Sequence, residues 1–278
     1  MEYLLQVNDM NISFDIQGNK VDVIKNLSLN LKKGEILSIV GASGSGKSVF
    51  SHALMGILPQ NAEFSAEILF NEQKLDKNTQ VSQFALIPQT SSYLDPLMKI
   101  SKQITLVDND LSEKSKNLYP FQCSGGMIRN ALFSLAHEKD ASIIIADEPT
   151  PGLDLESAIN ALNELEKLAK MGKSVILITH DIDLAINISD RIAVFYDGTI
   201  LEIANKSDFE KNTLRHPYTK ALFNALPQNG FKSYDFSVKG NEKACFCSNI
   251  CENFSEKCTN EQVFREFRDG MVRCNNAT

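Results

Sequence analysis

The chain has 278 residues, of which 43% are hydrophobic and 23% are charged, a balance typical of a folded globular protein rather than a disordered one. Its 28 basic and 35 acidic side chains give a formal net charge of −7, which argues against a dedicated nucleic-acid binder, because such proteins carry a basic surface. No apolar stretch approaches the roughly 20 residues that span a bilayer, and the N-terminus lacks the basic and apolar regions of a secretory signal. We therefore expect a cytoplasmic protein.

Hydrophobic patterning predicts strands first and then an alternation of strands and helices. The first 90 residues contain five predicted strands and one helix, namely strands 11–16, 27–31, 35–40, 68–70 and 84–87 and helix 49–58. Residues 90–120 are polar without a sustained period, which indicates a less regular insertion. The later elements are helices 127–137, 157–170 and 182–188 and strands 142–146, 174–179 and 191–196. This alternation predicts an α/β fold with a parallel sheet covered on both faces.

The regular pattern ends near residue 230. Beyond it the sequence is polar and rich in cysteine. We therefore expect a main domain at residues 1–230 and a Cys-rich C-terminal extension at residues 231–278.

One glycine-rich segment between a predicted strand and a predicted helix matches the phosphate-loop pattern G-x-x-x-x-G-K-[ST] at every fixed position. It reads Gly41-Ala42-Ser43-Gly44-Ser45-Gly46-Lys47-Ser48. Its glycines let backbone N–H groups point at phosphate oxygens, and the start of the next helix adds a positive dipole end. Lys47 is expected to reach the β- and γ-phosphates, and the Ser48 hydroxyl to ligate Mg²⁺. The sequence therefore predicts a nucleotide-binding site.

An acidic pair, Asp147 and Glu148, ends the apolar strand 142–146. Adjacent residues on a strand point to opposite sides, so the two carboxylates are expected to have different roles. Asp147 is expected to hold Mg²⁺, and Glu148 to act as general base on the attacking water. Such a pair alone is usually a solvated strand end, but the complete phosphate loop favours catalysis.

Further motifs keep a fixed order along the chain. Gln89 ends a strand-like run, Ser124-Gly125-Gly126 opens a helix, Asp154 follows the acidic pair, and His180 ends another strand. With the phosphate loop and the acidic pair, these motifs resemble those of the nucleotide-binding subunits of ABC transporters, over roughly residues 3–230.

The resemblance implies a role for each motif. Gln89 would contact Mg²⁺ and the attacking water, and His180 would contact the γ-phosphate. The Ser124-Gly125-Gly126 signature would bind the γ-phosphate held by the opposite subunit, as a helix N-terminus facing an anion. Asp154 would lie at the subunit interface.

The resemblance also implies a phosphate-loop NTPase fold of the ABC type, with an antiparallel β subdomain and a helical subdomain at about residues 90–140. Gln89 and Ser124 are only 35 positions apart, which is short for the family, so we expect a reduced helical subdomain. Cys123 and the pair Arg129-Asn130 depart from the residues usual around the signature. These departures suit a heterodimer with a related ATPase chain.

Two short segments narrow the resemblance. His216–Leu222 and Gly56–Pro59 are similar to segments of ATPases from oligopeptide, dipeptide and nickel importers. The resemblance implies ATP and Mg²⁺ at the site, and peptides or nickel as cargo. It also implies two membrane permease subunits, an extracytoplasmic substrate-binding protein, and a peripheral location at the cytoplasmic face of the cell membrane.

Five of the six cysteines lie in the predicted extension. In a reducing cytosol such a cluster indicates metal or redox chemistry rather than disulfides. The spacing of Cys245, Cys251, Cys258 and Cys274 resembles the extension of oligopeptide and dipeptide importer ATPases, which can carry a [4Fe–4S] cluster. Zinc, which prefers closer cysteine pairs, and free thiols are the alternatives. Cys247 is either a bystander or a substitute ligand.

The leading hypothesis is an ATP-binding and ATP-hydrolysing importer subunit. One alternative is a soluble ABC protein of DNA maintenance, but such proteins usually carry long coiled coils or zinc modules, for which the interval 89–124 is too short. The other is an iron–sulfur assembly factor, against which the importer-like segment 216–222 argues.

Overall fold

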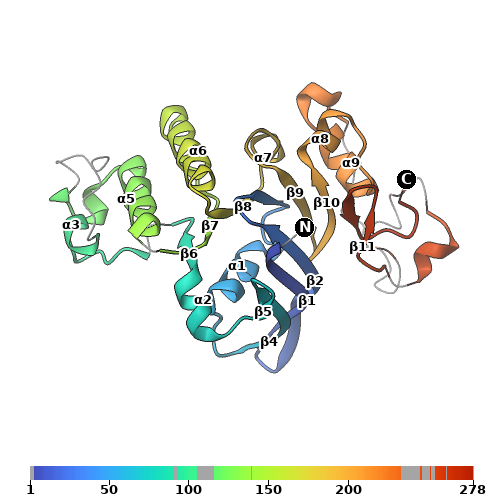
Figure 1. The fold of residues 1–278 in the computed structure, drawn as a ribbon, viewed down its shortest axis with the longest axis horizontal. Coiled ribbons are helices and arrows are strands. Elements are labelled where there is room, and N and C mark those ends of the chain that lie inside the picture. Colours follow the sequence, from blue (N-terminus) through green and yellow to red (C-terminus); the bar gives the residue numbers. More distant parts are fainter. Residues whose placement is uncertain are drawn as a thin grey trace.

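The structure is a computed structural model that describes residues 3–90, 93–104, 116–138, 140–232, 245, 251, 254–260 and 262–277. Within these residues the strands form two sheets (Figure 1). One is a four-stranded antiparallel sheet in the order β2-β1-β4-β5, and the other is an eight-stranded sheet in the order β11-β12-β10-β9-β3-β8-β7-β6. The predicted α/β architecture is therefore confirmed.

The middle of the large sheet is parallel. Its parallel strands are β3 (Ile36–Val40), β6 (Phe84–Ile87), β7 (Ile143–Asp147), β8 (Ser174–Thr179) and β9 (Arg191–Tyr196). Since parallel strands share one direction, the loops that follow β3, β8, β7 and β6 leave the same edge of the sheet. The phosphate loop, His180, the acidic pair and Gln89 lie in those four places.

Both faces of the parallel strands are buried. On β7, Ile143 and Ile145 pack into one hydrophobic core, while Ile144 and Ala146 pack into another. This strict alternation explains why the strand reads as an unbroken apolar run, because neither face meets water. The predicted covering of the sheet on both faces is confirmed.

The antiparallel sheet packs against one of these cores. Its strands are β1 (Tyr3–Ile16), β2 (Asn19–Lys32), β4 (Ala62–Phe70) and β5 (Gln73–Lys74). The hydrophobic residues of β1 and β2, such as Leu5 and Leu27, are fully buried in the core that also receives Ile143. This sheet is the antiparallel β subdomain that the sequence predicted.

Among the described residues, the α-helices connect the strands along the chain. They are α1 (Lys47–Met55), α2 (Lys77–Gln83), α3 (Ile100–Gln103), α5 (Gly125–Glu138), α6 (Leu155–Lys170), α7 (Ile182–Ile188), α8 (Lys206–Glu210) and α9 (Pro217–Asn224). In Figure 1, α5, α6 and α7 lie on one side of the large sheet, and α1, α2 and the antiparallel sheet lie on the other. Helix α1 ends at Gly56, whose φ of 70° is left-handed, earlier than the predicted end at residue 58.

Part of the expected irregular insertion is regular. The short helix α3 lies within residues 90–120, and the 3-10 turn η2 (Pro120–Gln122) begins at their end. Residues 105–115 are outside the described part of the chain, so the expected reduction of the helical subdomain stays a prediction.

The C-terminal residues include regular structure that the sequence did not predict. The strands β11 (Arg265–Phe267) and β12 (Gly270–Val272) form a hairpin, and β12 pairs antiparallel with β10 (Thr199–Asn205). Two 3-10 turns, η3 (Pro227–Asn229) and η4 (Glu256–Thr259), precede the hairpin. The domain boundary near residue 230 stays a prediction.

Candidate functional site

The glycine-rich loop adopts a backbone that few other residues tolerate. Gly44 and Gly46 have φ values of 76° and 111°, in the left-handed region that favours glycine. A Cβ at Gly41 would lie 2.4 Å from the Phe195 carbonyl oxygen, so β9 leaves no room for a side chain there. The Ser45 Oγ is buried without a hydrogen-bond partner among the described residues. The loop is thus tightly curled and holds an unsatisfied polar atom.

Lys47 is folded into this loop. Its Nζ donates hydrogen bonds to the carbonyl oxygens of Gly41 at 2.7 Å and Ala42 at 2.8 Å. Burial lowers the pKa of its ammonium group, and the nearby carboxylates of Glu148 and Asp147 act in the opposite direction. The structure therefore brings Lys47 and the acidic pair into one electrostatic environment.

Asp147 and Ser48 form the place expected for Mg²⁺. The Asp147 Oδ1 is buried without a hydrogen-bond partner in the described part of the chain. Burial raises the pKa of the Asp147 carboxyl and the charge of Glu148 adds to that rise, whereas the Ser48 side chain acts in the opposite direction. Hard oxygen ligands of this kind suit Mg²⁺, whose positive charge would compensate the buried carboxylate. The residues present therefore fit this cofactor.

Glu148 lies where three of the predicted motifs meet. Its Oε2 accepts a hydrogen bond from the Gln89 Nε2 at 2.8 Å, and its Oε1 lies 3.2 Å from the His180 Nδ1. Its backbone φ of 43° is left-handed, which is strained for a residue with a side chain and is typical of functional sites. The structure thus brings together the three predicted catalytic residues.

The chain is similar in sequence to proteins of a known family. Residues 24–151 match the family described as ABC transporter. The chain is 35% identical to the oligopeptide transport ATP-binding protein OppD of Bacillus subtilis, in a match covering 81% of this chain and 72% of that protein. The chain belongs to the ABC transporter family.

Further relatives agree with this assignment of the ABC subunit. The dipeptide transport ATP-binding protein DppD of Lactococcus lactis is 33% identical, over 81% of this chain and 74% of that protein. The dimeric ATP-binding cassette MJ0796, solved with ADP and Pi, superposes with a TM-score of 0.64 at 25% identity, over 73% of this chain and 98% of that one. The predicted ABC-type fold is therefore confirmed.

The signature Ser124-Gly125-Gly126 of this ABC subunit packs against the segment 152–157 and not against its own phosphate loop. Among the described residues outside α5, a Cβ built on Gly125 would meet Gly152 and Leu153 within 4 Å, and one built on Gly126 would meet Ser157. Ser124 and Gly125 are exposed at the start of α5. The predicted role of the signature in binding phosphate therefore concerns a surface of this chain outside its own loop 41–48.

Asp154 also has a structural role, which was not predicted from the sequence. It is the N-cap of α6, and its carboxylate accepts hydrogen bonds from the Ser157 N–H at 2.9 Å and the Ser157 Oγ at 2.8 Å. These hydrogen bonds lower the pKa of the exposed Asp154 carboxyl. Its predicted place at a subunit interface stays a prediction.

The four predicted cysteine ligands lie among the described residues of this ABC subunit, and three of them are buried. Cys245, Cys258 and Cys274 are buried, Cys251 is half-buried, and the Cys245 N–H donates to the Cys258 carbonyl at 3.0 Å. Burial raises the pKa of the Cys274 thiol to about 11, and the other three thiols add to that rise. Among the described residues, however, no group of three or more His, Cys, Asp or Glu has the arrangement of a metal site. Cys247 lies outside the described residues.

Two contacts near the site were not predicted. The Arg129 guanidinium, on α5, donates to the backbone carbonyls of Pro88 and Gln89. The Tyr93 Oη and the His52 Nε2 lie 3.2 Å apart, at hydrogen-bond distance. Arg129 was noted from the sequence only as a departure from the residues usual in the family, and no sequence pattern links Arg129 or His52 to its partner.

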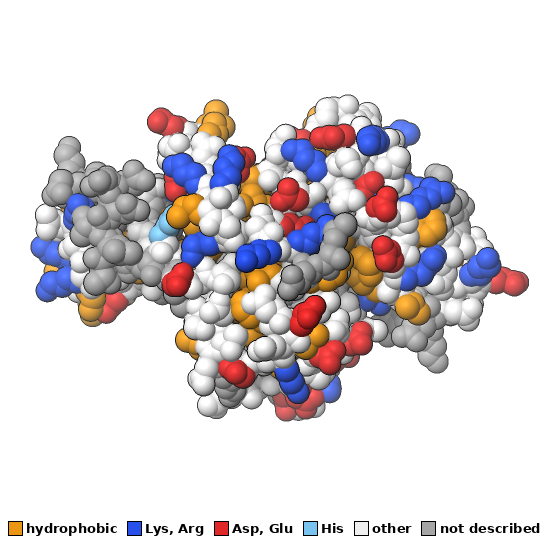
Figure 2. All heavy atoms as spheres, viewed as in Figure 1, with side chains coloured by type: hydrophobic (Ala, Val, Ile, Leu, Met, Phe, Trp, Pro, Cys, Tyr) orange, Lys and Arg blue, Asp and Glu red, His pale blue; other side chains and the backbone are white. Residues whose placement is uncertain are grey.

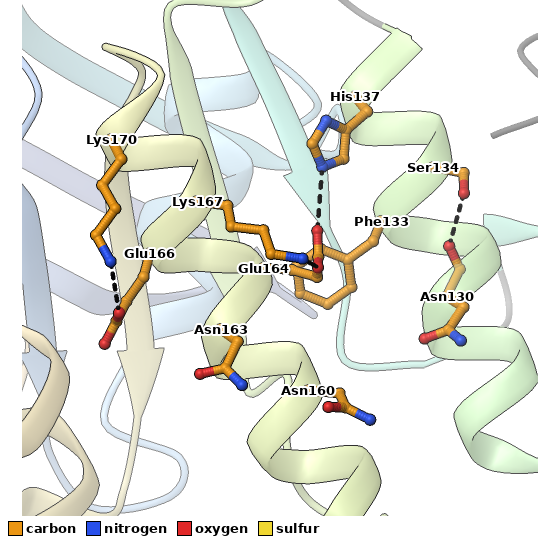
Figure 3. A pocket seen from close by; sticks show the side chains of 10 residues that line it. All are labelled: Asn130, Phe133, Ser134, His137, Asn160, Asn163, Glu164, Glu166, Lys167 and Lys170. Atoms are coloured by element: carbon orange, nitrogen blue, oxygen red, sulfur yellow. Dashed lines mark hydrogen bonds and ion pairs between the residues drawn. The ribbon is translucent and has the colours of Figure 1, made fainter. Parts of the chain in front are cut away.

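A polar groove of about 530 Å³ separates α5 from α6. Figure 3 shows His137 of α5 facing Glu164 of α6, where the Nε2 and Oε2 atoms lie 3.7 Å apart, while Lys167 also pairs with Glu164. None of the predicted nucleotide-site residues lines this groove.

No helix among the described residues is long and apolar enough to cross a membrane.

Proposed function

We propose that this ABC subunit binds ATP with its phosphate loop and hydrolyses it with Glu148 as the general base. The observation that carries the proposal is that the Glu148 carboxylate contacts both Gln89 and His180. Glu148 has a strained backbone and lies at the same edge of the sheet as the phosphate loop. Glu148 would accept a proton from the attacking water, and Gln89 would orient that water. His180, which is exposed, would contact the γ-phosphate.

Two other groups of residues would bind the nucleotide and its metal ion without taking part in proton transfer. Lys47 would exchange its hydrogen bonds to the Gly41 and Ala42 carbonyls for bonds to the oxygens of the β- and γ-phosphates. Ser48, Asp147 and Gln89 would hold Mg²⁺, which supplies positive charge to the transferring phosphoryl group.

The active form is proposed to be a sandwich of two ATPase subunits. The signature Ser124-Gly125-Gly126, whose first two residues are exposed, lies at the N-terminus of a 14-residue helix and would bind the γ-phosphate held by the partner. Asp154 would lie at the interface nearby, since its segment packs against the signature glycines. We propose a related chain as partner, because the residues around the signature of this chain depart from the usual ones.

The cargo is proposed to be short peptides, because the relatives named above are oligopeptide and dipeptide transport proteins. Nickel is the alternative. The subunit would act on permease subunits at the cytoplasmic face of the membrane, with a substrate-binding protein on the other side. A role in DNA maintenance is not favoured, and Figure 2 shows Lys and Arg interspersed with Asp and Glu over the visible face rather than gathered into a basic one.

Uptake in cells tests this assignment. Cells lacking the gene would be complemented with the wild type or with Glu148→Gln, and labelled short peptides and radioactive nickel would be supplied in parallel. We expect peptide uptake to be lost and to return with the wild type alone. Loss of nickel uptake alone would move the protein to a metal importer, and unchanged uptake of both would contradict the importer function.

We further propose that Cys245, Cys251, Cys258 and Cys274 ligate a [4Fe–4S] cluster, with zinc as the alternative. The support is the spacing of the four cysteines along the sequence, the burial of Cys245, Cys258 and Cys274, and the backbone hydrogen bond between Cys245 and Cys258. Protein purified without oxygen should contain iron and acid-labile sulfide. Cys258→Ser should lose both, whereas Cys123→Ser, on the signature side of the molecule, should keep both. A colourless wild type with stoichiometric zinc would contradict the cluster.

A further inference from the structure

Arg129 is a buried cation that the proposed mechanism does not use. It lies on α5, one turn after Gly125, and only 5% of its surface is exposed. Its Nη1 donates to the Pro88 carbonyl at 2.7 Å and its Nη2 to the Gln89 carbonyl at 3.3 Å. The guanidinium therefore joins the signature helix to the segment that follows β6.

No ion pair joins this cation to a carboxylate among the described residues. Burial lowers the pKa of the Arg129 guanidinium, and no carboxylate among the described residues opposes that change. Its Nε is buried without a hydrogen-bond partner in the same part of the chain. Buried guanidinium groups are usually paired with carboxylates, because desolvation of an unpaired charge is costly. The burial of Arg129 thus costs folding free energy, so stability alone does not explain an arginine at this position.

The segment that Arg129 holds carries the Gln89 side chain into the site. Pro88 has no N–H to donate, so its buried carbonyl is its main polar contact. Gln89 comes next, and its side chain donates to Glu148 at 2.8 Å. By holding the carbonyls on both sides of the Gln89 N–H, the guanidinium fixes the peptide from which the Gln89 side chain projects.

Attachment of α5 to the protein does not depend on this contact. Ala131, Leu132 and Phe133 of the same helix are buried in the core that covers one face of the large sheet. These residues dock the helix by apolar contact, and Arg129 adds a polar link in one direction only, toward Gln89.

We propose that Arg129 is a positioning residue for hydrolysis, which holds the Gln89 amide against Glu148. This role rests on the proposed ATPase function. Because Arg129 and the signature share one helix, the guanidinium also ties Gln89 to the surface that would meet the partner's nucleotide. A shift of about 1 Å in a catalytic group is enough to lower a rate on the order of a hundredfold.

A double-mutant cycle on the full-length chain, in the assembly in which the wild type hydrolyses ATP, tests this role. Arg129→Gln should lower kcat on the order of tenfold and change the KM for ATP less than twofold, since Arg129 lies outside the phosphate loop. In a Gln89→Ala background the same change should lower kcat no further, because the group that it positions is gone. Arg129→Lys, which keeps the charge but loses the fork, should give an intermediate kcat.

Controls separate this role from a structural one. Asn130→Ala, at the exposed neighbour of Arg129, should leave kcat unchanged. An equal loss of kcat with and without Gln89, or a lower melting temperature with normal kcat in both Arg129 variants, would overturn the proposal. If Arg129→Gln does not fold, the same comparison of kcat with and without Gln89 is made with Arg129→Lys. Failure of the ATPase function itself would appear differently, as a wild type without turnover.

Discussion

At the scale of single residues, the site depends on backbone conformations as much as on side chains. Glu148 adopts a left-handed φ so that its carboxylate meets both Gln89 and His180. Gly46 adopts a φ of 111° so that the loop can turn into α1. Such conformations cost stability and persist because the surrounding sheet fixes them.

Gly46→Ala tests this dependence. Its φ is unfavourable for alanine, and the new Cβ would lie 3.1 Å from Ile24 Cδ1 and 3.2 Å from the Val23 carbonyl oxygen. We expect a loss of about 1–3 kcal/mol of unfolding free energy together with loss of ATP binding. The measurements are a urea unfolding curve and a nucleotide titration.

Gly34→Ala is the matched control, because Gly34 also has a left-handed φ, of 71°, but faces open space. It should cost about 1 kcal/mol through strain alone and leave ATP affinity unchanged. Equal losses of ATP affinity in both variants would show that the crowding at Gly46 has no special role.

At the scale of elements, the four loops that follow β3, β8, β7 and β6 gather the site at one sheet edge. Helix α6 then begins at Asp154, where an N-cap and a proposed interface residue coincide. The structural and functional interpretations of Asp154 can be separated, since capping needs a side-chain oxygen whereas an interface contact needs the carboxylate charge.

Two substitutions at Asp154 make this separation. Asp154→Ala should lower the unfolding free energy by about 1 kcal/mol, because it removes the cap. Asp154→Asn should keep the cap and the stability, and should lower the rate of ATP hydrolysis if the charge acts at the subunit interface. Normal hydrolysis in a stable Asp154→Asn would leave Asp154 with the cap as its whole role.

At the scale of the whole molecule, the C-terminal hairpin is joined to the main sheet by both backbone and side chains. The buried Arg273 donates to the carbonyl oxygens of Asn26 at 2.7 Å, Gln262 at 3.1 Å and Ile200 at 3.3 Å, and its own N–H donates to Leu201 at 2.8 Å. Through Asn26 it reaches β2, whose Val23 and Ile24 line Gly46. The C-terminal residues and the phosphate loop thus both contact β2.

Arg273→Ala should therefore lower the unfolding free energy by about 2–4 kcal/mol, because it leaves several buried carbonyls without a donor. Arg265→Ala, at an exposed arginine of the same hairpin, should cost less than about 1 kcal/mol. Denaturant unfolding of the two variants measures the difference. Equal stabilities would contradict the view that Arg273 joins the hairpin to the sheet.

The sequence allowed prediction of the parts of this molecule that obey local rules. The phosphate loop, the acidic pair and the strand ends at Gln89 and His180 each carry a short pattern, and a parallel sheet brings their ends together. The hairpin at 265–272 has no such pattern, because its strands are three residues each and are stabilised by pairing with β10. The contacts of Arg129 with Pro88 join residues about 40 positions apart, so only the folded chain shows them.

The most direct test of the account is ATP turnover by Glu148→Gln compared with the wild type, with ATP binding measured in the same preparations. Glutamine keeps the size of the side chain but cannot accept a proton from water. We predict that the variant binds ATP with near-normal affinity and loses nearly all turnover, by a factor of at least about 100. Turnover close to that of the wild type would contradict the assignment of Glu148 as the general base and, with it, the proposed chemistry of the site.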